Sequence, residues 1–287
     1  MKELLERIKE KLASYKSALI AYSGGVDSTL LAVLARKTPG LRMKAIMEDS
    51  PSMPRSVRTK AIERARQLDI PLEIHPSRGF YNSEYQANSP NRCYICKKDF
   101  YSDFLEVAHR EKYLYLLDGL NADDNYDYRP GTIAARELNV SSPFQELGIN
   151  KIQIRALSSE LGLPTAEEPA MACLASRIPY GEPITIEKLR MIDEAEEFLH
   201  SIGFKTLRVR HHQCSTGSLA RIELGENEMG EISKKKDVFR EIAEKFYQIG
   251  YVHCCLDLEG YRMGSLNPFV GSFLQRKERK SSSPTDD

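Results

Sequence analysis

The feature that most constrains the fold is a regular alternation of apolar and amphipathic segments in the first half of the chain. Short strand-like segments occupy residues 17–23, 43–49, 71–77 and 113–120, and helical patterns fill the intervals at 27–38, 55–68 and near 97–110. Strands that alternate with helices of this length pair in parallel, and the helices cover the sheet. We therefore expect an α/β fold whose ligands lie beyond the carboxyl ends of the strands.

The second half of the chain follows a different pattern. Residues 131–163 are helix-like, and the stretch from 162 to 185 carries four prolines and two glycines, which is typical of an ordered loop or linker. Beyond it we predict helices at 185–201 and 229–247 and strands at 206–212, 218–224 and 251–258, which is a small α+β arrangement. The expected domains are 1–168, a loop at 169–184, a C-terminal domain at 185–270 and a disordered polar tail at 271–287.

Composition excludes several classes of protein. Lys plus Arg equals Asp plus Glu at 41 each, and this balance argues against a large nucleic-acid partner. No stretch approaches the roughly 18 apolar residues needed to cross a bilayer. The first sixteen residues form a charged amphipathic pattern without the apolar core of a signal peptide, so we expect a cytoplasmic protein. Its six cysteines are then expected to be thiols, metal ligands or catalysts rather than disulfides.

The turn after the first predicted strand reads S-G-G-V-D-S. A glycine-rich turn at the start of a helix presents main-chain N–H groups to an anion, and Gly24 and Gly25 give this turn its freedom. It lacks the lysine of the Walker A loop and the third glycine of the dinucleotide fingerprint. Ser23 and Ser28 can donate to phosphate oxygens, and Asp27 can hold Mg²⁺. The alternative is an ordinary strand–turn–helix.

This motif resembles the loop of the N-type ATP pyrophosphatases, the PP-loop family. The resemblance implies a parallel-sheet domain, similar to the adenine nucleotide alpha hydrolases, that cradles the pyrophosphate of ATP. Such enzymes transfer AMP to an oxygen of their substrate and so create a good leaving group. The resemblance also places Gly119 and Asp123, in LDGLNADD after the fourth strand, beside the nucleotide. Met47, in the second strand, is a further candidate for nucleotide binding.

Three cysteines form the second candidate constellation. Cys93 and Cys96 make a C-x-x-C, which suits a metal site or a redox pair, but no second C-x-x-C completes a zinc site. Cys173 lies in a loop with proline on both sides and is followed by Ser176 and Arg177, which indicates a reactive site or, alternatively, a buried thiol. Three thiolates can ligate three irons of a [4Fe-4S] cluster and leave the fourth iron open to sulfide.

The remaining cysteines are interpreted as structural. Cys254 and Cys255 are adjacent in a predicted strand, so their side chains point to opposite faces. Cys214 follows His211 and His212, and this order allows either a metal ligand or an exposed strand end. We favour the strand end.

A narrower resemblance rests on four segments taken together. SGGVDS, ACLASRIPYG, LRVRHH and DLEGYRMGSLN resemble the LarE family over residues 1 to about 268. Members of this family are PP-loop sulfur transferases that make the nickel-pincer nucleotide cofactor used by lactate racemase. The second and fourth segments are far more specific than the loop alone.

The resemblance implies a reaction and a set of roles. ATP, with Mg²⁺, adenylylates a carboxylate of pyridinium-3,5-biscarboxylic acid mononucleotide, and a sulfur nucleophile displaces AMP to leave a thiocarboxylate. Some members sacrifice the sulfur of a cysteine that matches Cys173, whereas this chain adds Cys93 and Cys96 and resembles the members that carry a [4Fe-4S] cluster. Cys173, Ser176 and Arg177 are the catalytic candidates. A sulfide source or sulfur-donor protein and a homo-oligomer are the implied partners, and no membrane is implied.

Two arginines are candidates for the phosphate of the substrate. Arg208 and Arg210 stand two apart in a predicted strand, hence on one face. The planar guanidinium suits phosphate, which it can bind through two hydrogen bonds. The alternative is a solvated strand face.

Three other functions compete with this interpretation. Enzymes that thiolate tRNA also combine a PP-loop with cluster cysteines, although the zero net charge counts against an RNA substrate. Amidotransferases or ligases such as NAD or GMP synthase use ammonia and do not need the cysteines. A nucleotide-binding regulator would bind ATP without turnover.

Overall fold

The structure is a computed structural model that describes residues 2–125, 130–169, 172–232, 234, 237–262 and 266. The chain divides into two compact units. The first comprises Met1–Cys173 and Pro183–Thr185, and the second comprises Leu174–Glu182 and the chain from Ile186 onward. The predicted tail at 271–287 lies outside the described residues, as does most of the RMGSLN segment. Within the described parts, no helix is both long and apolar enough to cross a membrane.

The first unit is built on a parallel sheet of four strands, as the alternating pattern predicts. The strand order is β3-β2-β1-β4. The strands are β1 (Ser17–Ala21), β2 (Arg42–Asp49), β3 (Leu72–Pro76) and β4 (Tyr115–Leu117). All five residues of β1 are buried, because this strand is central and helices cover both of its faces.

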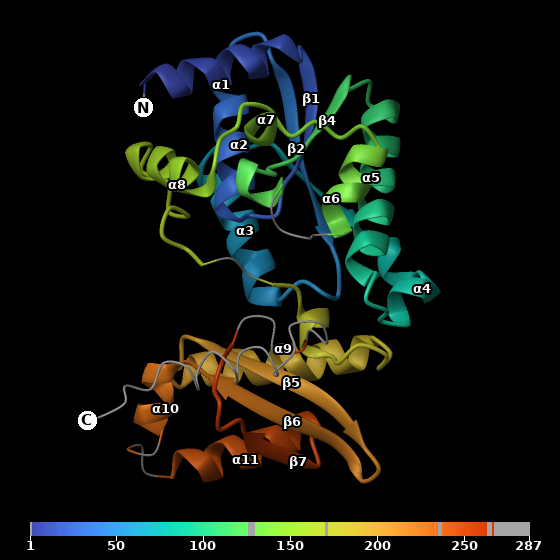
Figure 1. Ribbon diagram of the computed structural model, residues 1–287, viewed down its shortest axis with the longest axis vertical. Helices are drawn as coiled ribbons and strands as arrows, with labels where there is room; N and C mark the ends of the chain where they lie inside the picture. Colours follow the sequence, from blue (N-terminus) through green and yellow to red (C-terminus); the bar gives the residue numbers. More distant parts are fainter. Residues whose placement is uncertain are drawn as a thin grey trace, which may run out of the picture. The chain divides into compact units, whose positions relative to one another are not determined.

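The helices of this unit pack on the two faces of the sheet. Ala18 and Ile20 of β1 belong to one core, with α1 (Lys2–Ser14), α2 (Val26–Arg36), α3 (Arg55–Gln67), α7 (Pro143–Glu146) and α8 (Lys151–Glu160). Leu19 belongs to the core on the other face, with α5 (Arg92–Arg110) and α6 (Pro130–Glu137). Figure 1 shows α2 and α8 on one side of the sheet and α5 and α6 on the other. This alternation along one strand is the period of two that a doubly covered sheet requires.

Short elements connect the third strand to the long helix α5. These are the 3₁₀ turn η1 (Gly79–Tyr81) and the one-turn helix α4 (Ser83–Gln86), whose first turn is capped by the side chain of Asn82. A second 3₁₀ turn, η2 (Ala122–Asn125), follows β4. The predicted fourth strand ends early because Asp118 turns the chain: its carboxylate accepts a hydrogen bond from the N–H of Leu120 at 3.1 Å.

The second unit contains a three-stranded sheet of order β5-β6-β7. Strands β5 (Leu207–Cys214) and β6 (Gly217–Leu224) form an antiparallel hairpin, and β7 (His253–Leu256) pairs parallel to β6. One face of this sheet packs with α9 (Ile186–Ser201) and α11 (Val238–Ile249). The 3₁₀ turn η3 (Leu174–Arg177) belongs to the same unit.

One helix prediction is wrong. The segment 229–247 was expected to be a single helix, whereas the structure has α10 (Glu226–Ile232) and α11 (Val238–Ile249). Asp237, at the N-cap of α11, has a left-handed backbone with φ 63°. A non-glycine residue in this conformation interrupts a right-handed helix, so apolar periodicity alone could not place the break.

His211 is a polar residue in the apolar core of the second unit. Its side chain is fully buried on β5, its ring centroid lies 5.5 Å from that of Tyr251, and neither ring nitrogen has a hydrogen-bond partner among the described residues. Burial, together with the positive charges of Lys188 and His212, lowers the pKa of His211 to about 4. The native state therefore holds this imidazole neutral.

We predict that this histidine makes the fold less stable in mild acid. The unfolded chain binds a proton at His211 with an ordinary pKa near 6.5, so stability falls as the pH drops below 6.5 and stops falling below about 4. The loss amounts to about 2 kcal/mol between pH 7 and pH 5 by linkage. Urea unfolding of His211→Phe at both pH values should show a smaller pH dependence than the wild type. The exposed His253→Phe is the matched control, and an equal effect in both variants would contradict the assignment.

Candidate active site

The loop between β1 and α2 has the geometry of an anion site. The hydroxyls of Ser23 and Ser28 lie 3.1 Å apart, and Ser28 Oγ also donates to the carbonyl of Gly25 at 3.2 Å. The N–H of Gly25 makes a long contact of 3.4 Å to Ser23 Oγ. Helix α2 begins at Val26, so its first N–H groups lie beside these hydroxyls. A helix N-terminus with two hydroxyls and a weakly engaged N–H suits a phosphate group.

Close packing makes Gly24 necessary to this loop. Its φ is +76°, and a Cβ placed there would lie 2.4 Å from Cβ of Ala61 in α3. Both the backbone conformation and the missing side chain are therefore required. The loop also lies close to Gly119, because a Cβ at that position would lie 3.0 Å from the N atom of Ser28.

Asp27 lies in the first turn of α2 and contacts two polar side chains. Its carboxylate pairs with Nζ of Lys151, at the start of α8, and accepts a hydrogen bond from Asn121 Nδ2 at 3.4 Å. Asp123 lies beside them and accepts from the N–H of Lys151 at 2.9 Å. The segments that follow β1 and β4 thus bring two carboxylates together, and Lys151 of α8 contacts both of them.

These residues suit a metal–nucleotide complex by their chemistry. Mg²⁺ is usually held by one or two carboxylates together with the phosphates of its nucleotide, and Asp27 and Asp123 could supply those oxygens. Lys151 could neutralise phosphate charge from the same place. These roles rest on donor type and proximity.

Sequence reasoning missed Lys151 and Asn121. Asn121 lies in the LDGLNADD segment, which the resemblance places beside the nucleotide. Nothing in this polar sequence indicates that the Asn121 side chain is buried. Lys151 is separated from Asp27 by 124 residues. The available signal was the start of α8, where Asn150 and Gln153 form a capping box that fixes the first helical residue.

Met47 lies in the core rather than in an open cleft. Its side chain is fully buried in β2 and belongs to the same core as the apolar residues of α2 and α3. We therefore expect any contact between Met47 and the nucleotide to be made by the main-chain atoms of this residue. That contact stays a prediction.

The three candidate cysteines belong to the first unit. Cys93 and Cys96 lie three residues apart near the start of α5, hence on one helical face. Cys173 is the last residue of the long first stretch of this unit. Burial raises the pKa of the Cys93 thiol, and the charge of Cys173 raises it further. Burial also raises the pKa of Cys96, as do the neighbouring charges of Glu48 and Cys173. Cys173 therefore affects the ionisation of both cysteines of α5, although it lies in a different segment of the chain.

The thiols do not form a ready metal site. None of the six cysteines is in a disulfide, and within the described ranges no three His, Cys, Asp or Glu side chains gather as ligands of one ion. Thiol donors are the right chemistry for iron. The metal-binding role of Cys93, Cys96 and Cys173 therefore stays a prediction.

Ser176 and Arg177 fall in the second unit, unlike Cys173. The Arg177 side chain is fully buried and makes two bonds to Glu196, from Nε at 3.0 Å and from Nη2 at 2.9 Å. Its Nη1 donates to Ser176 Oγ at 3.0 Å. Glu196 also accepts a hydrogen bond from the N–H of Val209 at 2.9 Å. This one carboxylate of α9 therefore contacts both η3 and β5. Arg177 is anchored in the fold.

The two predicted phosphate-binding arginines differ in their surroundings. Both lie on the face of β5 opposite the core, as their spacing predicts. Arg210 is buried and pairs with Glu223 at 2.6 Å, and it also donates to the carbonyl of Ser176 at 3.0 Å. Arg208 has no carboxylate partner in the parts of the chain that the structure describes. Its Nη1 donates to the carbonyl of Leu207 at 2.6 Å, and its guanidinium lies 5.0 Å from the ring centroid of Tyr261.

Arg208 is therefore the better candidate for binding an anion. Burial lowers the pKa of Arg208, and the positive charge of Arg177 lowers it further. The group remains charged at neutral pH, because a guanidinium is not deprotonated in proteins. A phosphate would relieve the repulsion between these arginines.

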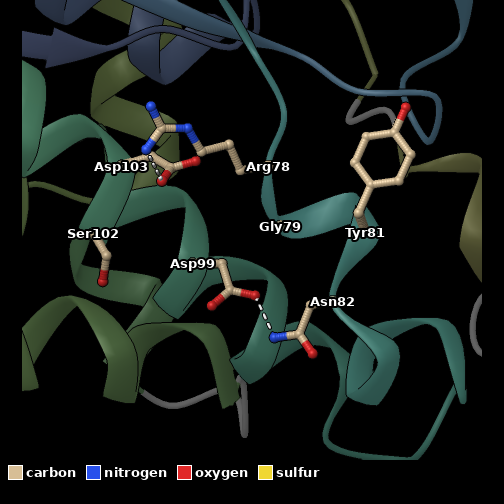
Figure 2. Close-up of a pocket in the computed structure, with 7 residues that line it drawn as sticks. All are labelled: Arg78, Gly79, Tyr81, Asn82, Asp99, Ser102 and Asp103. Carbon is tan, nitrogen blue, oxygen red and sulfur yellow. Dashed lines mark hydrogen bonds and ion pairs between the residues drawn. The ribbon is translucent and has the colours of Figure 1, made fainter.

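A separate pocket of about 350 Å³ lies between η1 and α5. Figure 2 shows Asp99 bonded to Asn82 across it, at 2.7 Å, and Arg78 beside Asp103 at 3.8 Å. None of the predicted site residues lines this pocket. Arg78 pairs with Asp103 and Asp99 accepts a hydrogen bond from Asn82, so we assign no ligand to this pocket.

Comparison with known proteins identifies the family. No family model matches the chain. It is 40% identical over 263 residues to an uncharacterized protein of Synechocystis sp., an alignment that covers 92% of this chain and 96% of that protein. It is 32% identical over 257 residues to the pyridinium-3,5-bisthiocarboxylic acid mononucleotide synthase of Lactiplantibacillus plantarum, with 89% and 91% covered.

A more distant relative extends the likeness to another type of enzyme. The chain is 30% identical over 214 residues to a subunit of the glutamine-hydrolyzing GMP synthase of Methanocaldococcus jannaschii, with 67% of this chain and 66% of that protein covered. This relative is also an enzyme. The identity and coverage shared with the synthase from L. plantarum decide the family: the chain belongs to the LarE family.

Proposed function

We propose that the protein is an ATP-dependent sulfur transferase that acts on pyridinium-3,5-biscarboxylic acid mononucleotide. The observation that carries the proposal is the turn at residues 23–28, which has the geometry of an anion site. Asp27, at the start of α2, pairs there with Lys151, at the start of α8. Membership of the LarE family supports the choice of substrate. The product is the corresponding thiocarboxylate, and the same cycle at the second carboxylate gives the bisthiocarboxylate.

The first step activates the carboxylate. A carboxylate oxygen of the substrate attacks the α-phosphorus of ATP, the bond to the bridging oxygen breaks and pyrophosphate leaves. The N–H groups and hydroxyls of the loop hold the departing pyrophosphate, and Lys151 neutralises part of its charge. Asp27 would hold Mg²⁺, which would supply further charge neutralisation there. The resulting acyl adenylate has AMP as a leaving group in place of an oxide ion.

The second step transfers sulfur. A sulfur nucleophile attacks the carbonyl carbon, the carbon–oxygen bond to AMP breaks, and AMP leaves. We propose that Cys93, Cys96 and Cys173 hold a [4Fe-4S] cluster, which would supply sulfide at its open iron. In the alternative, the Cys173 thiolate attacks, the α-proton of this residue is then removed and its Cβ–S bond breaks, so that dehydroalanine remains in the chain.

The second unit is proposed to bind the phosphate of the mononucleotide. Arg208 supplies the cation, because Arg177 and Arg210 already hold buried carboxylates. A tRNA thiolation enzyme remains the second candidate for a PP-loop protein with these cysteines. Activity on the small mononucleotide without tRNA would decide against it.

The loop assignment predicts the behaviour of Asp27→Asn. This change keeps the shape of the side chain but removes the charge that pairs with Lys151 and would hold Mg²⁺. We expect substrate-dependent pyrophosphate release to fall by roughly 100-fold, since a metal contact stabilises phosphoryl-transfer charge by several kcal/mol. The exposed Asp69→Asn is the matched control and should keep full activity. Unimpaired release in Asp27→Asn would refute the loop assignment.

The sulfur step predicts that Cys173→Ser separates the two half-reactions. Pyrophosphate release in the presence of substrate should continue, whereas thiocarboxylate formation, followed by mass spectrometry, should stop. Cys255→Ser, at an exposed thiol of β7, is the control and should keep both activities. Thiocarboxylate formed by Cys173→Ser would make Cys173 a structural residue.

Iron content distinguishes the two sulfur sources. We expect about four irons per chain, with a broad visible charge-transfer band, in anaerobically purified protein, and neither in the triple Cys→Ala variant at 93, 96 and 173. Protein that holds no iron under these conditions, and whose chain is lighter by one H₂S after turnover, would instead identify Cys173 as the donor.

The phosphate assignment predicts a selective effect of Arg208→Ala. Loss of a charged hydrogen-bonding group costs about 1.5–3 kcal/mol, so the Kd of the mononucleotide should rise by roughly 10- to 150-fold while that of ATP stays unchanged. Calorimetric titration with each ligand measures both. Arg240→Ala, at an exposed residue of α11, is the control. An equal loss of both affinities would place the phosphate elsewhere.

A further inference from the structure

One buried guanidinium joins the candidate ATP loop to the segment that leads to Cys173. Arg64 of α3 is 8% exposed, and its Nη1 donates to the carbonyl of Gly24 at 2.5 Å. Its Nη2 donates to Glu168 Oε1 at 2.6 Å. These residues all belong to the first unit. The two bonds use both arms of the fork, so one side chain contacts both segments.

The bond to Gly24 fixes the orientation of a peptide group. The Gly24 carbonyl and the Gly25 N–H belong to the same planar peptide and point in opposite directions. A peptide between two glycines turns over easily, since neither residue has a Cβ to oppose the change. By holding the carbonyl toward α3, Arg64 keeps the Gly25 N–H directed away from that helix. This N–H makes only a 3.4 Å contact in the described structure, which leaves it available to an anion.

An anion on this N–H would affect the bond made by Arg64. Hydrogen bonds at the two ends of one peptide polarise each other, so a phosphate on the Gly25 N–H strengthens the bond that the Gly24 carbonyl accepts. Arg64 is then drawn more firmly to the loop. Because the guanidinium is planar and rigid, its other arm is fixed at the same time.

The other arm holds the segment that precedes Cys173. Arg155 of α8 fixes the main chain of the same segment, with Nη1 on the carbonyl of Ala166 and Nη2 on that of Glu168 at 2.8 Å. Glu168 is thus held by its carboxylate and by its carbonyl. Cys173 follows five residues later, and residues 170–171 lie outside the described ranges.

We infer that Arg64 and Glu168 are positioning residues that couple the binding of ATP at residues 23–28 to the placement of the Cys173 segment. The coupling orders the two half-reactions, because nucleotide in the loop strengthens these contacts and holds the sulfur-bearing segment more firmly. This inference rests on the proposed function, in which the loop binds ATP and Cys173 takes part in sulfur transfer. Coupling is reciprocal, so the same contacts also strengthen nucleotide binding.

Hydrogen exchange in the presence of a non-hydrolysable ATP analogue tests the coupling. The analogue is α,β-methylene ATP with Mg²⁺, and the reporter is a peptide that spans residues 163–175. In the wild type we expect the analogue to slow exchange of this peptide by at least about 5-fold. In Glu168→Gln, which keeps the shape of an already half-exposed side chain, the effect should fall below about 2-fold. Glu167→Gln, at the exposed neighbour, is the matched control and should behave like the wild type.

Two companion measurements separate this role from a merely structural one. Calorimetric titration of the analogue is carried out on all three proteins, and the ratio of pyrophosphate released to thiocarboxylate formed is measured with substrate. If Glu168 couples the two steps, the ratio of pyrophosphate to thiocarboxylate rises in Glu168→Gln. If Glu168 only stabilises the fold, the ratio is unchanged. Full protection or an unchanged ratio in Glu168→Gln would overturn the inference while leaving the proposed function intact. Failure of the wild type to bind the analogue would overturn the proposed function, and the coupling with it.

Discussion

The contact between Gly24 and α3 determines how the candidate ATP loop is built. Because the loop backbone reaches Ala61 where no side chain fits, the end of β1, the start of α2 and one face of α3 have fixed relative positions. Tyr22 adds to this contact by donating its hydroxyl to the carbonyl of Ala61 at 3.3 Å. The N–H groups of the turn are therefore already oriented before an anion arrives, and preorganised donors bind without a further cost of ordering.

Much of this arrangement follows from the sequence, because it depends on local patterns. The alternation of apolar strands and amphipathic helices predicts the parallel sheet, and the two glycines after β1 predict the turn. The spacing of Arg208 and Arg210 predicts a shared strand face, which the pairing of β5 with β6 confirms. Each of these inferences uses residues that are close together in the chain, where geometry is set by the periods of helix and strand.

The parts that could not be predicted depend on distant contacts. The pairing of Lys151 with Asp27 spans 124 residues, and that of Arg64 with Glu168 spans 104. No local pattern distinguishes Arg64 from its exposed neighbour Arg66, since both lie in a strongly charged helix. Likewise, Arg177 looks like an anion-binding residue beside Cys173 in the sequence, and only the fold shows that Glu196 already compensates its charge.

In the second unit, charge compensation distinguishes Arg208 from the other two candidate arginines. A buried guanidinium is costly unless a carboxylate accompanies it, and Glu196 and Glu223 serve this purpose for Arg177 and Arg210. An arginine bonded in this way has little to offer a substrate, because an incoming phosphate would have to displace a carboxylate. Arg208 is half-buried beside Arg177, and the repulsion between them opposes its charge. We therefore expect a phosphate at Arg208 to bind without displacing a carboxylate and to relieve this repulsion, which would add to its affinity.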